Sequence, residues 1–264
     1  MESKIQNVEV IVDNELLRQP IMEEKQKNPF IAFAKKLFKH KGAIFGSIII
    51  FLFIFCAIFA TWLAPYDYDK PEQSAMLQTP SGQHIFGTDE FGRDIFSRVV
   101  HGSQISLQVA LIAVFFSLIV GTVLGAFAGY YGGAIDYVIS SITDIAYSFP
   151  TTLLAIAFIA MLGPGLQSVI IAIALASWAG YCRVVRGQFL SLKNREFVDA
   201  ARILGMSDAR IIFRHILPNA LAPVIVMATL ELPKAIIIEA SLSFLGLGTQ
   251  PPLPSWGVTL DSGK

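Results

Sequence analysis

Ionisable residues that stand inside long apolar stretches are the first candidates for chemistry in this sequence. Asp144, Glu231, Lys234 and Glu239 each interrupt such a stretch. At the centre of a membrane helix an ionisable side chain costs roughly 2.5–3.5 kcal/mol, and residues kept at that cost commonly mark a substrate or ion path. We therefore expect these four residues to line a path or to take part in gating.

Some of these residues also have a purely structural interpretation. Asp144 can hydrogen-bond a neighbouring helix, with Pro150 kinking the chain just beyond it. Glu231 and Lys234 are three residues apart, so they share one helical face and can neutralise each other. Alternatively, Glu231 meets a cationic group of a substrate. The sequence alone leaves both interpretations open.

Other kinds of chemical site find no support in the sequence. Cys56 and Cys182 lie in apolar runs, and with four scattered histidines they make neither a disulfide framework nor a structural zinc site. There is no phosphate-binding loop, because five residues instead of four separate Gly257 from Gly263-Lys264 and no Ser or Thr follows. Metalloprotease and serine hydrolase motifs are missing as well. We expect no catalytic residue, no metal and no cofactor, so any use of ATP requires a separate subunit.

The composition indicates a membrane protein. The chain has 264 residues, of which 54% are hydrophobic and only 15% are charged, against about 25% charged in an ordinary soluble domain. Its formal net charge is zero, which argues against a nucleic-acid-binding protein with a basic excess and against a disordered polyelectrolyte.

Five apolar segments are long enough to be membrane spans, and they predict an all-α polytopic helical bundle. Residues 42–63 provide 22 mostly apolar positions, about 33 Å of helix against a hydrocarbon core of about 30 Å. The other expected spans are residues 106–130, 137–162, 166–182 and 218–247. Glycines at 121, 125 and 129, spaced by four, predict close helix packing within the second span.

The distribution of charge predicts the orientation of these spans. Residues 1–41 contain eight Lys and Arg residues, residues 67–98 contain three against six acids, and residues 183–214 contain seven against three. Because Lys and Arg accumulate on the cytoplasmic side, we expect a cytoplasmic N-terminal tail at 1–41 and a cytoplasmic loop at 183–218. The segment 64–104 then forms an extracytoplasmic loop, and 105–264 form the core transmembrane domain.

The loop at 194–218 has the pattern of a helical hairpin. Asn194 can cap a first helix, Gly205 suits the left-handed position that ends it, and Ser207 can cap a second helix that leads through Pro218 into the fifth span. The apolar residues expected to share helix faces are Phe197, Ala201 and Leu204, then Ile211, Ile212 and Ile216. Three roles compete: a loop that only anchors topology, a DNA-binding helix-turn-helix, and a hairpin that docks into a cytoplasmic partner. Its membrane tethers and its apolar second helix argue against DNA binding.

This loop resembles that of binding-protein-dependent ABC transporter permeases, whose pattern is E-A-A-x3-G followed by I-x-L-P. Asp199 stands where Glu is usual, and His215 occupies the nominal Ile position. In that family the loop is the coupling element that seats in a cleft of the ATPase subunit. The resemblance therefore implies an ATPase-coupling role for Asp199, Ala200, Ala201, Gly205, Met206, Ser207, Asp208, Leu217 and Pro218.

Two further segments resemble one subgroup of that family, the dipeptide, oligopeptide, nickel and glutathione permeases. One is the run F-G-T-D-E-F-G-R-D-I-F-S-R at 86–98, and the other is E-A-S-L-S-F-L-G-L-G at 239–248 with the prolines and S-W-G that follow. The resemblance covers about 45–264. It implies a sixth span, so the sequence as given is expected to stop one helix short.

The subgroup also implies the function. We expect a multi-pass subunit in a bacterial inner membrane that imports short peptides, with nickel, a nickel chelate or glutathione as alternative substrates. The implied partners are a second homologous permease, two cytoplasmic ATP-binding subunits, an extracytoplasmic substrate-binding protein and the lipid membrane, with no nucleic acid. A membrane scaffold or receptor without transport is the remoter alternative.

Overall fold

The computed structural model describes residues 37–263, so most of the predicted tail at 1–41 lies outside the described residues. The described chain is helical and contains no strand beyond an isolated bridge between Thr88 and Asp94. The longer helices are α3 (Lys41–Ile58), α5 (Ile95–Tyr131), α6 (Gly133–Tyr147), α7 (Thr151–Leu162), α8 (Leu166–Leu192) and α11 (Leu217–Phe244). The shorter elements are α4 (Ala60–Leu63), η1 (Gln73–Ala75), α9 (Glu196–Ile203), α10 (Asp208–Arg210), η2 (Ile211–Ile216) and α12 (Trp256–Asp261). The described chain divides into two units between Leu52 and Phe53, and the helices from α4 onward lie in the second unit.

The expected spans are present as helices, with shifted ends. Four continuous helices in the described chain are long and apolar enough to cross a membrane, and the bent pair α6–α7 can make a fifth. Helix α5 begins eleven residues before the expected start of the second span, because Asp94 caps it by accepting a hydrogen bond from the Ser97 backbone N–H. Helix α8 continues ten residues beyond Cys182, where Arg183 and Arg186 form ion pairs with α6. Length and apolarity therefore identify a span better than they place its ends.

The third span is broken rather than kinked. Helix α6 ends at Tyr147, α7 begins at Thr151, and their axes differ by 93°. Pro150 sits in the break: it has no N–H to continue the ladder, and it disfavours helical geometry at Phe149. The kink expected at Pro150 is therefore a full break: the sequence located the interruption correctly but predicted one kinked helix where the structure has two.

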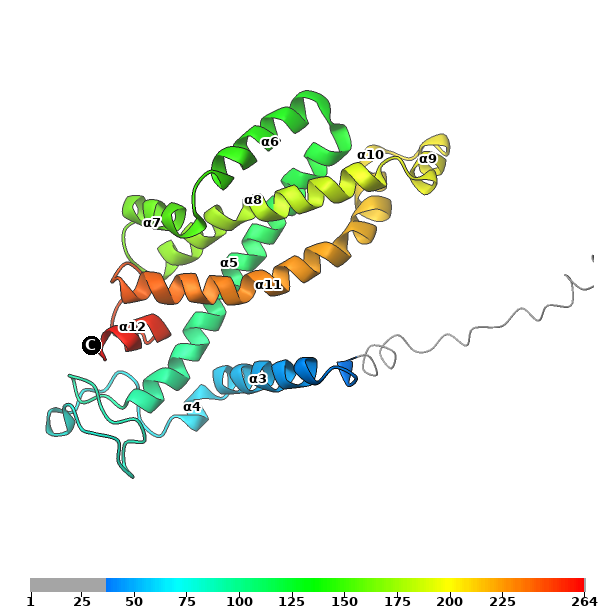
Figure 1. Ribbon diagram of the computed structural model, residues 1–264. Coiled ribbons are helices and arrows are strands. Elements are labelled where there is room, and N and C mark those ends of the chain that lie inside the picture. Colours follow the sequence, from blue (N-terminus) through cyan, green and yellow to red (C-terminus); the bar gives the residue numbers. More distant parts are fainter. Residues whose placement is uncertain (1–36, 264) are drawn as a thin grey trace, which may run out of the picture. The chain divides into compact units, whose positions relative to one another are not determined.

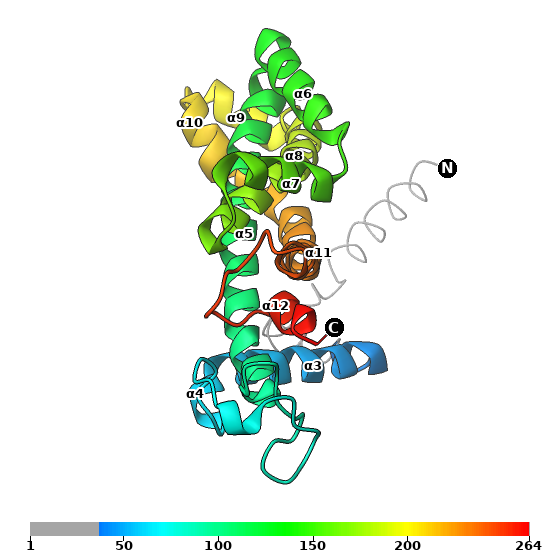
Figure 2. The same cartoon turned by 90° about the vertical axis from the view of Figure 1, so that its left-hand side faces the viewer.

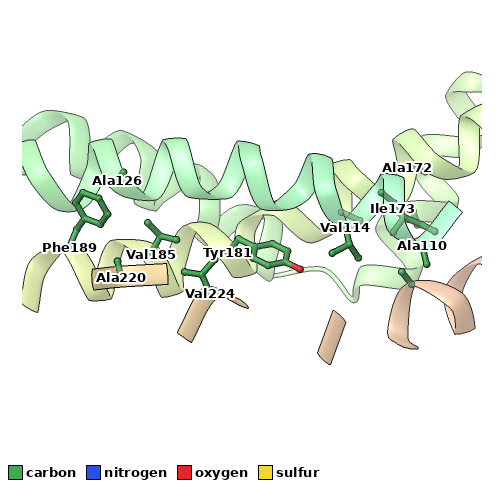
Figure 3. Close-up of a cluster of buried hydrophobic side chains, with 14 of the residues drawn as sticks. Ala110, Val114, Ala126, Ala172, Ile173, Tyr181, Val185, Phe189, Ala220 and Val224 are labelled. Atoms are coloured by element: carbon green, nitrogen blue, oxygen red, sulfur yellow. The ribbon is translucent and has the colours of Figure 1, made fainter. Parts of the chain in front are cut away.

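The core of this unit is the contact between α5 and α8 (Figures 1 and 2). A Cβ atom built on Gly121, Gly125 or Gly129 of α5 would come within about 2.4–2.5 Å of atoms of α8. The three glycines therefore let the two helix backbones meet, as their spacing predicts. Figure 3 shows Tyr181, Val185 and Phe189 of α8 in one buried cluster with side chains of α5 and α11.

Helix α11 runs between two small helical segments. Figure 1 shows α9 and α10 at one end of α8 and α11, and α12 at the other end of α11. Helix α12 packs on α11 and α5 (Figure 2). A Cβ atom on Gly257 would lie 2.1 Å from the Ala240 carbonyl oxygen, and the Trp256 indole N–H donates to the Val99 carbonyl at 3.0 Å. The Ser-Trp-Gly motif thus joins the ends of α11 and α5.

Replacing Gly125 by Ala is expected to destabilise the protein by about 1–3 kcal/mol, because the added methyl would lie 2.5 Å from the Cys182 carbonyl oxygen and 2.9 Å from Val185 Cβ. Thermal unfolding of the purified protein in detergent measures the loss. Gly187→Ala in α8 is the matched control, since no heavy atom lies within 4 Å of that position and Ala favours helix. Equal melting temperatures for the two variants would contradict the packing role.

Candidate functional site

The hairpin expected at 194–218 is present, and its turn is built around Gly205. Helix α9 ends with the Met206 N–H donating to the Ala201 carbonyl and the Gly205 N–H donating to the Arg202 carbonyl. This pair of bonds is a Schellman motif, which needs a left-handed residue at the position of Gly205. Gly205 has φ +72°, so the sequence prediction for this glycine is confirmed.

Two local predictions about the first helix of the hairpin are wrong. The helix starts at Glu196 with Arg195 as its N-cap residue, one position later than the expected cap Asn194, and no side chain caps it. The buried face is formed by Val198 and Ala201 instead of Phe197, Ala201 and Leu204. Val198 and Ala201 belong to the same buried cluster as the isoleucines of the second helix, so packing against the body chooses the face.

The second helix of the hairpin begins after Ser207, as predicted, although the Ser207 side chain makes no capping hydrogen bond. It does not stop before the fifth span. Residues from Asp208 to Phe244 form one continuous helix, with a π-helical turn at Ile211–Ile216. Pro218 lies at the start of α11, directly after this turn. The wider turn places the proline, which has no N–H, where the regular ladder is already interrupted.

One hydrogen bond joins the hairpin to the end of α5. The Tyr130 hydroxyl donates to Asp208 Oδ1 at 2.6 Å, and the Arg202 guanidinium lies 5.9 Å from the centre of the Tyr130 ring. Asp208 was expected in the coupling loop from the sequence, whereas Tyr130 was not. The two residues are 78 positions apart, so no local pattern connects them.

The outer surface of the hairpin is apolar with a charged rim. Ile203 is 86% exposed and Leu204 is 74% exposed. Asp199 is also exposed and forms an ion pair of 3.1 Å with Arg202. We define the exposed hairpin residues as Phe197, Ile203, Leu204 and Phe213. Apolar side chains this open on a structured element commonly mark an interaction site.

A second feature is a cavity of about 450 Å³ between the α6–α7 break, α8 and α11. We call it the polar cavity, and its polar lining residues are Tyr147, Thr151, Thr152, Ser177, Glu231 and Lys234. The expected pair is formed there: Lys234 Nζ donates to Glu231 Oε1 at 2.6 Å. A separate apolar groove of about 930 Å³ lies between α5 and α11, and no ionisable residue lines it.

Asp144 and Glu239 lie outside the lining of the polar cavity. Asp144 is exposed and forms a 2.7 Å ion pair with Arg183 of α8, whose guanidinium lies over the Tyr147 ring at 4.2 Å. Glu239 is fully buried. Its carboxylate accepts hydrogen bonds from hydroxyl groups on α5, on α11 and on the turn that follows, namely those of Ser106 (2.9 Å), Ser243 (2.8 Å) and Thr249 (3.3 Å). Both acids therefore tie α8 or α11 to a neighbouring element.

The motif at 86–98 folds into a buried polar network before α5. Asp89 Oδ2 accepts a hydrogen bond from Arg93 Nε at 2.8 Å and lies 3.7 Å from Arg98 Nε. Asp89 Oδ1 accepts the backbone N–H groups of Phe91 and Arg93, both at 2.9 Å. His84 Nδ1 lies 2.9 Å from Asp94 Oδ1. The motif thus positions a loop and the start of α5 through charges that are nearly inaccessible to water.

Removing the hydroxyl of Tyr130 with Tyr130→Phe is expected to cost about 1 kcal/mol and to loosen the hairpin, because the hydrogen bond to Asp208 is lost. Amide hydrogen exchange at 196–212 measures the effect as faster exchange. Tyr131→Phe is the matched control, since Tyr131 is half exposed on the same helix end. Unchanged exchange in Tyr130→Phe would show that the hydrogen bond does not hold the hairpin.

The Asp89→Asn substitution is expected to destabilise the protein by about 3–5 kcal/mol, because it leaves the buried guanidinium groups of Arg93 and Arg98 without their counter-charge. Thermal unfolding in detergent measures the change. Glu90→Gln removes one charge from the exposed neighbouring position and serves as control. If both variants melt at the wild-type temperature, the network does not stabilise the loop.

Two family profiles and several curated relatives match this chain. Residues 121–263 match the binding-protein-dependent transport system inner membrane component, and residues 28–80 match the N-terminal TM domain of oligopeptide transport permease C. The chain is 52% identical over 237 residues to the dipeptide transport system permease protein of Alkalihalophilus pseudofirmus, covering 90% of this chain and 78% of that protein. It is 44% identical to the glutathione transport system permease protein of Shigella dysenteriae, over 93% of this chain and 82% of that protein. It is 41% identical to the di/tripeptide transport system permease protein of Pseudomonas aeruginosa, over 90% and 80% respectively.

Solved structures show the same fold. An inward-facing crystal form of the MetNI methionine ABC transporter matches with a TM-score of 0.50 and 23% identity, over 57% of this chain and 75% of that chain. A second crystal form matches with a TM-score of 0.50 and 20% identity, over 63% and 88%. With its apolar helices and its sequence matches, this chain belongs to the binding-protein-dependent inner membrane components, the multi-pass permease subunits of ABC importers.

Proposed function

We propose that this chain forms, with a second related permease subunit, the path by which short peptides cross a bacterial inner membrane. Two separate cytoplasmic ATPase subunits drive the transport, and an extracytoplasmic binding protein delivers the substrate. The chain itself carries no ATPase site and acts as a transport subunit. The observation that carries this proposal is the ordered hairpin between α8 and α11, which exposes apolar side chains and lies within the family match.

The construction of the hairpin supports a role in transmitting force. Its buried face is continuous with the core cluster, its turn is fixed by a Schellman motif, and Tyr130 joins it to α5. A displacement of the exposed hairpin residues is therefore transmitted to α5, α8 and α11 together. Rigid-body movement of these packed helices can open the path alternately to either side, as packed elements move as units.

The charge asymmetry supports the orientation. We place residues 1–41 and the loop 183–218 in the cytoplasm and residues 64–104 outside, with 42–63 as the first span and 105–264 as the core domain. Residues 183–214 contain seven Lys and Arg residues against three acids. In this orientation the hairpin faces the ATPase, and the network around Asp89 holds the loop that faces the binding protein.

Short peptides are the substrate class that the relatives favour. Two of the relatives above are named for dipeptide or di/tripeptide transport. Glutathione is the second candidate because a 44% identical relative is named for it, and glutathione is itself a small peptide with free carboxylates and an ammonium group. Uptake of labelled dipeptide and labelled glutathione by the assembled transporter separates the two.

The paired substitution Ile203→Asp and Leu204→Asp is expected to lower co-purification of the ATPase subunit about tenfold or more, because two charges replace exposed apolar contacts. A tagged chain co-expressed with its ATPase and partner permease provides the measurement. Gly205→Glu is expected to act in the same direction, since a non-glycine residue must adopt φ +72° there.

Met76→Asp is the control for this experiment. Met76 is 51% exposed and lies in the segment 64–104, on the opposite side of the membrane in the proposed orientation. It should recover the ATPase at the wild-type level. A wild-type chain that recovers no ATPase, or hairpin variants that recover it fully, would exclude this coupling role.

A further inference from the structure

We infer that the Glu231–Lys234 pair in the polar cavity is a docking site for the charged ends of the transported peptide, with Glu231 binding the terminal ammonium and Lys234 binding the terminal carboxylate. This inference rests on the proposed function, because it identifies the chemistry by which the path accepts a zwitterionic peptide.

The pair is accessible on one side. The Lys234 side chain is 63% exposed and that of Glu231 is 18% exposed, although their terminal atoms are only 2.6 Å apart. A pair closed off within the bundle could not separate, because each charge would be left buried and unpaired. Here Lys234 can leave its partner and bind another anion without moving the backbone.

The setting of the cavity favours a hydrated path. One of its walls is the α6–α7 break, where Tyr147, Phe149 and Thr151 all contribute to the lining. Non-helical backbone within a membrane is tolerated where it is covered by protein or lines a water-containing cavity, because its polar groups need partners. The helix break and the ion pair each cost free energy within a membrane, and both border the polar cavity.

The hydroxyl groups of the cavity are available to a substrate. Thr151, Thr152 and Ser177 line it, and within the described part of the chain their side chains have no hydrogen-bond partner. Peptide bonds carry donors and acceptors that need replacement partners when they leave water. Three hydroxyls beside two opposite charges provide for both the backbone and the ends of a short peptide.

An exchange of partners between the Glu231–Lys234 pair and the two ends of a peptide explains why the cavity contains both charges. A dipeptide or tripeptide spans about 7–10 Å at 3.3–3.6 Å per residue and carries one positive and one negative end. When it enters the cavity, the Glu231–Lys234 pair separates and each side chain takes the opposite end of the peptide. Two ion pairs replace one, no charge is left unpaired, and the pair closes again when the peptide leaves. A single acid or a single base would leave one end of the peptide uncompensated.

The charge swap Glu231→Lys with Lys234→Glu tests this exchange. It keeps an ion pair at the same positions but reverses the order of the charges. The complete transporter, with partner permease, ATPase subunits and binding protein, is reconstituted in liposomes and supplied with labelled Ala-Ala. The neutral double variant Glu231→Gln with Lys234→Met offers neither charge, so its uptake is expected to fall about tenfold or more. The swapped pair still offers one acid and one base, so its uptake is expected to stay well above that of the neutral variant, with the peptide bound in the opposite direction.

Thr229→Val is the matched control, since Thr229 is two residues from Glu231 but lines the apolar groove and bonds the Val226 carbonyl of its own helix. It should keep wild-type uptake. All three variants are scored as assembled complexes, and the uptake is compared at equal amounts of complex. Wild-type uptake by the neutral double variant, or a swapped variant that transports no better than the neutral one, would overturn the inference.

A second measurement keeps the inference testable if a double variant fails to assemble. The single variant Glu231→Gln is compared with wild type on Ala-Ala and on an N-acetylated peptide that the wild-type transporter carries. The ratio of variant to wild-type rate should fall about tenfold for the free peptide and stay near one for the acetylated peptide. Equal ratios would show a structural role only. Failure of the wild-type transporter to import any peptide would instead refute the proposed substrate class, and the inference with it.

Discussion

The contact between the backbones of α5 and α8 is the constraint on which the rest of the unit depends. Gly121, Gly125 and Gly129 remove the side chains that would hold the helices apart, so the two backbones approach closely along α8 from Trp178 to Phe189. Lipid tails are as apolar as the helix surfaces, so association in a membrane relies on such packing and on polar contacts more than on the hydrophobic effect. The remaining helices are then positioned against a rigid pair.

That rigid pair carries both candidate sites. The end of α5 provides Tyr130 for the hairpin, and Tyr181, Val185 and Phe189 of α8 form the buried cluster that continues into the hairpin and α11. A different stretch of α8, around Ser177 and Gly180, forms one wall of the polar cavity. The surface proposed to receive the ATPase and the cavity proposed to receive the substrate therefore share one packed framework, through which a displacement of one can change the other.

The sequence predicted the features that depend on local pattern. The apolar spans, the interruption at Pro150 (expected as a kink), the glycine packing face, the left-handed Gly205 and the Glu231–Lys234 pair all follow from spacing along one segment. What it could not predict depends on partners far along the chain: the Tyr130–Asp208 bond, the Arg183–Asp144 pair and the hydroxyl groups that bind Glu239. The buried face of α9 was also missed, because packing against the second helix of the hairpin selects it.

Glu239 shows how an intramembrane acid can be retained without lining the polar cavity. A fully buried carboxylate is stabilised only if its lone pairs are satisfied, and here hydroxyl donors from Ser106, Ser243 and Thr249 do so. Those donors come from α5, from α11 and from the turn that leads to α12, so the acid fixes three segments at one point. Glu231, by contrast, is bonded to an exposed cation and faces a cavity. The two acids therefore differ in their surroundings. Buried hydroxyl donors on three segments hold Glu239 in place, whereas Glu231 has an accessible counter-charge that leaves room for a substrate to replace it.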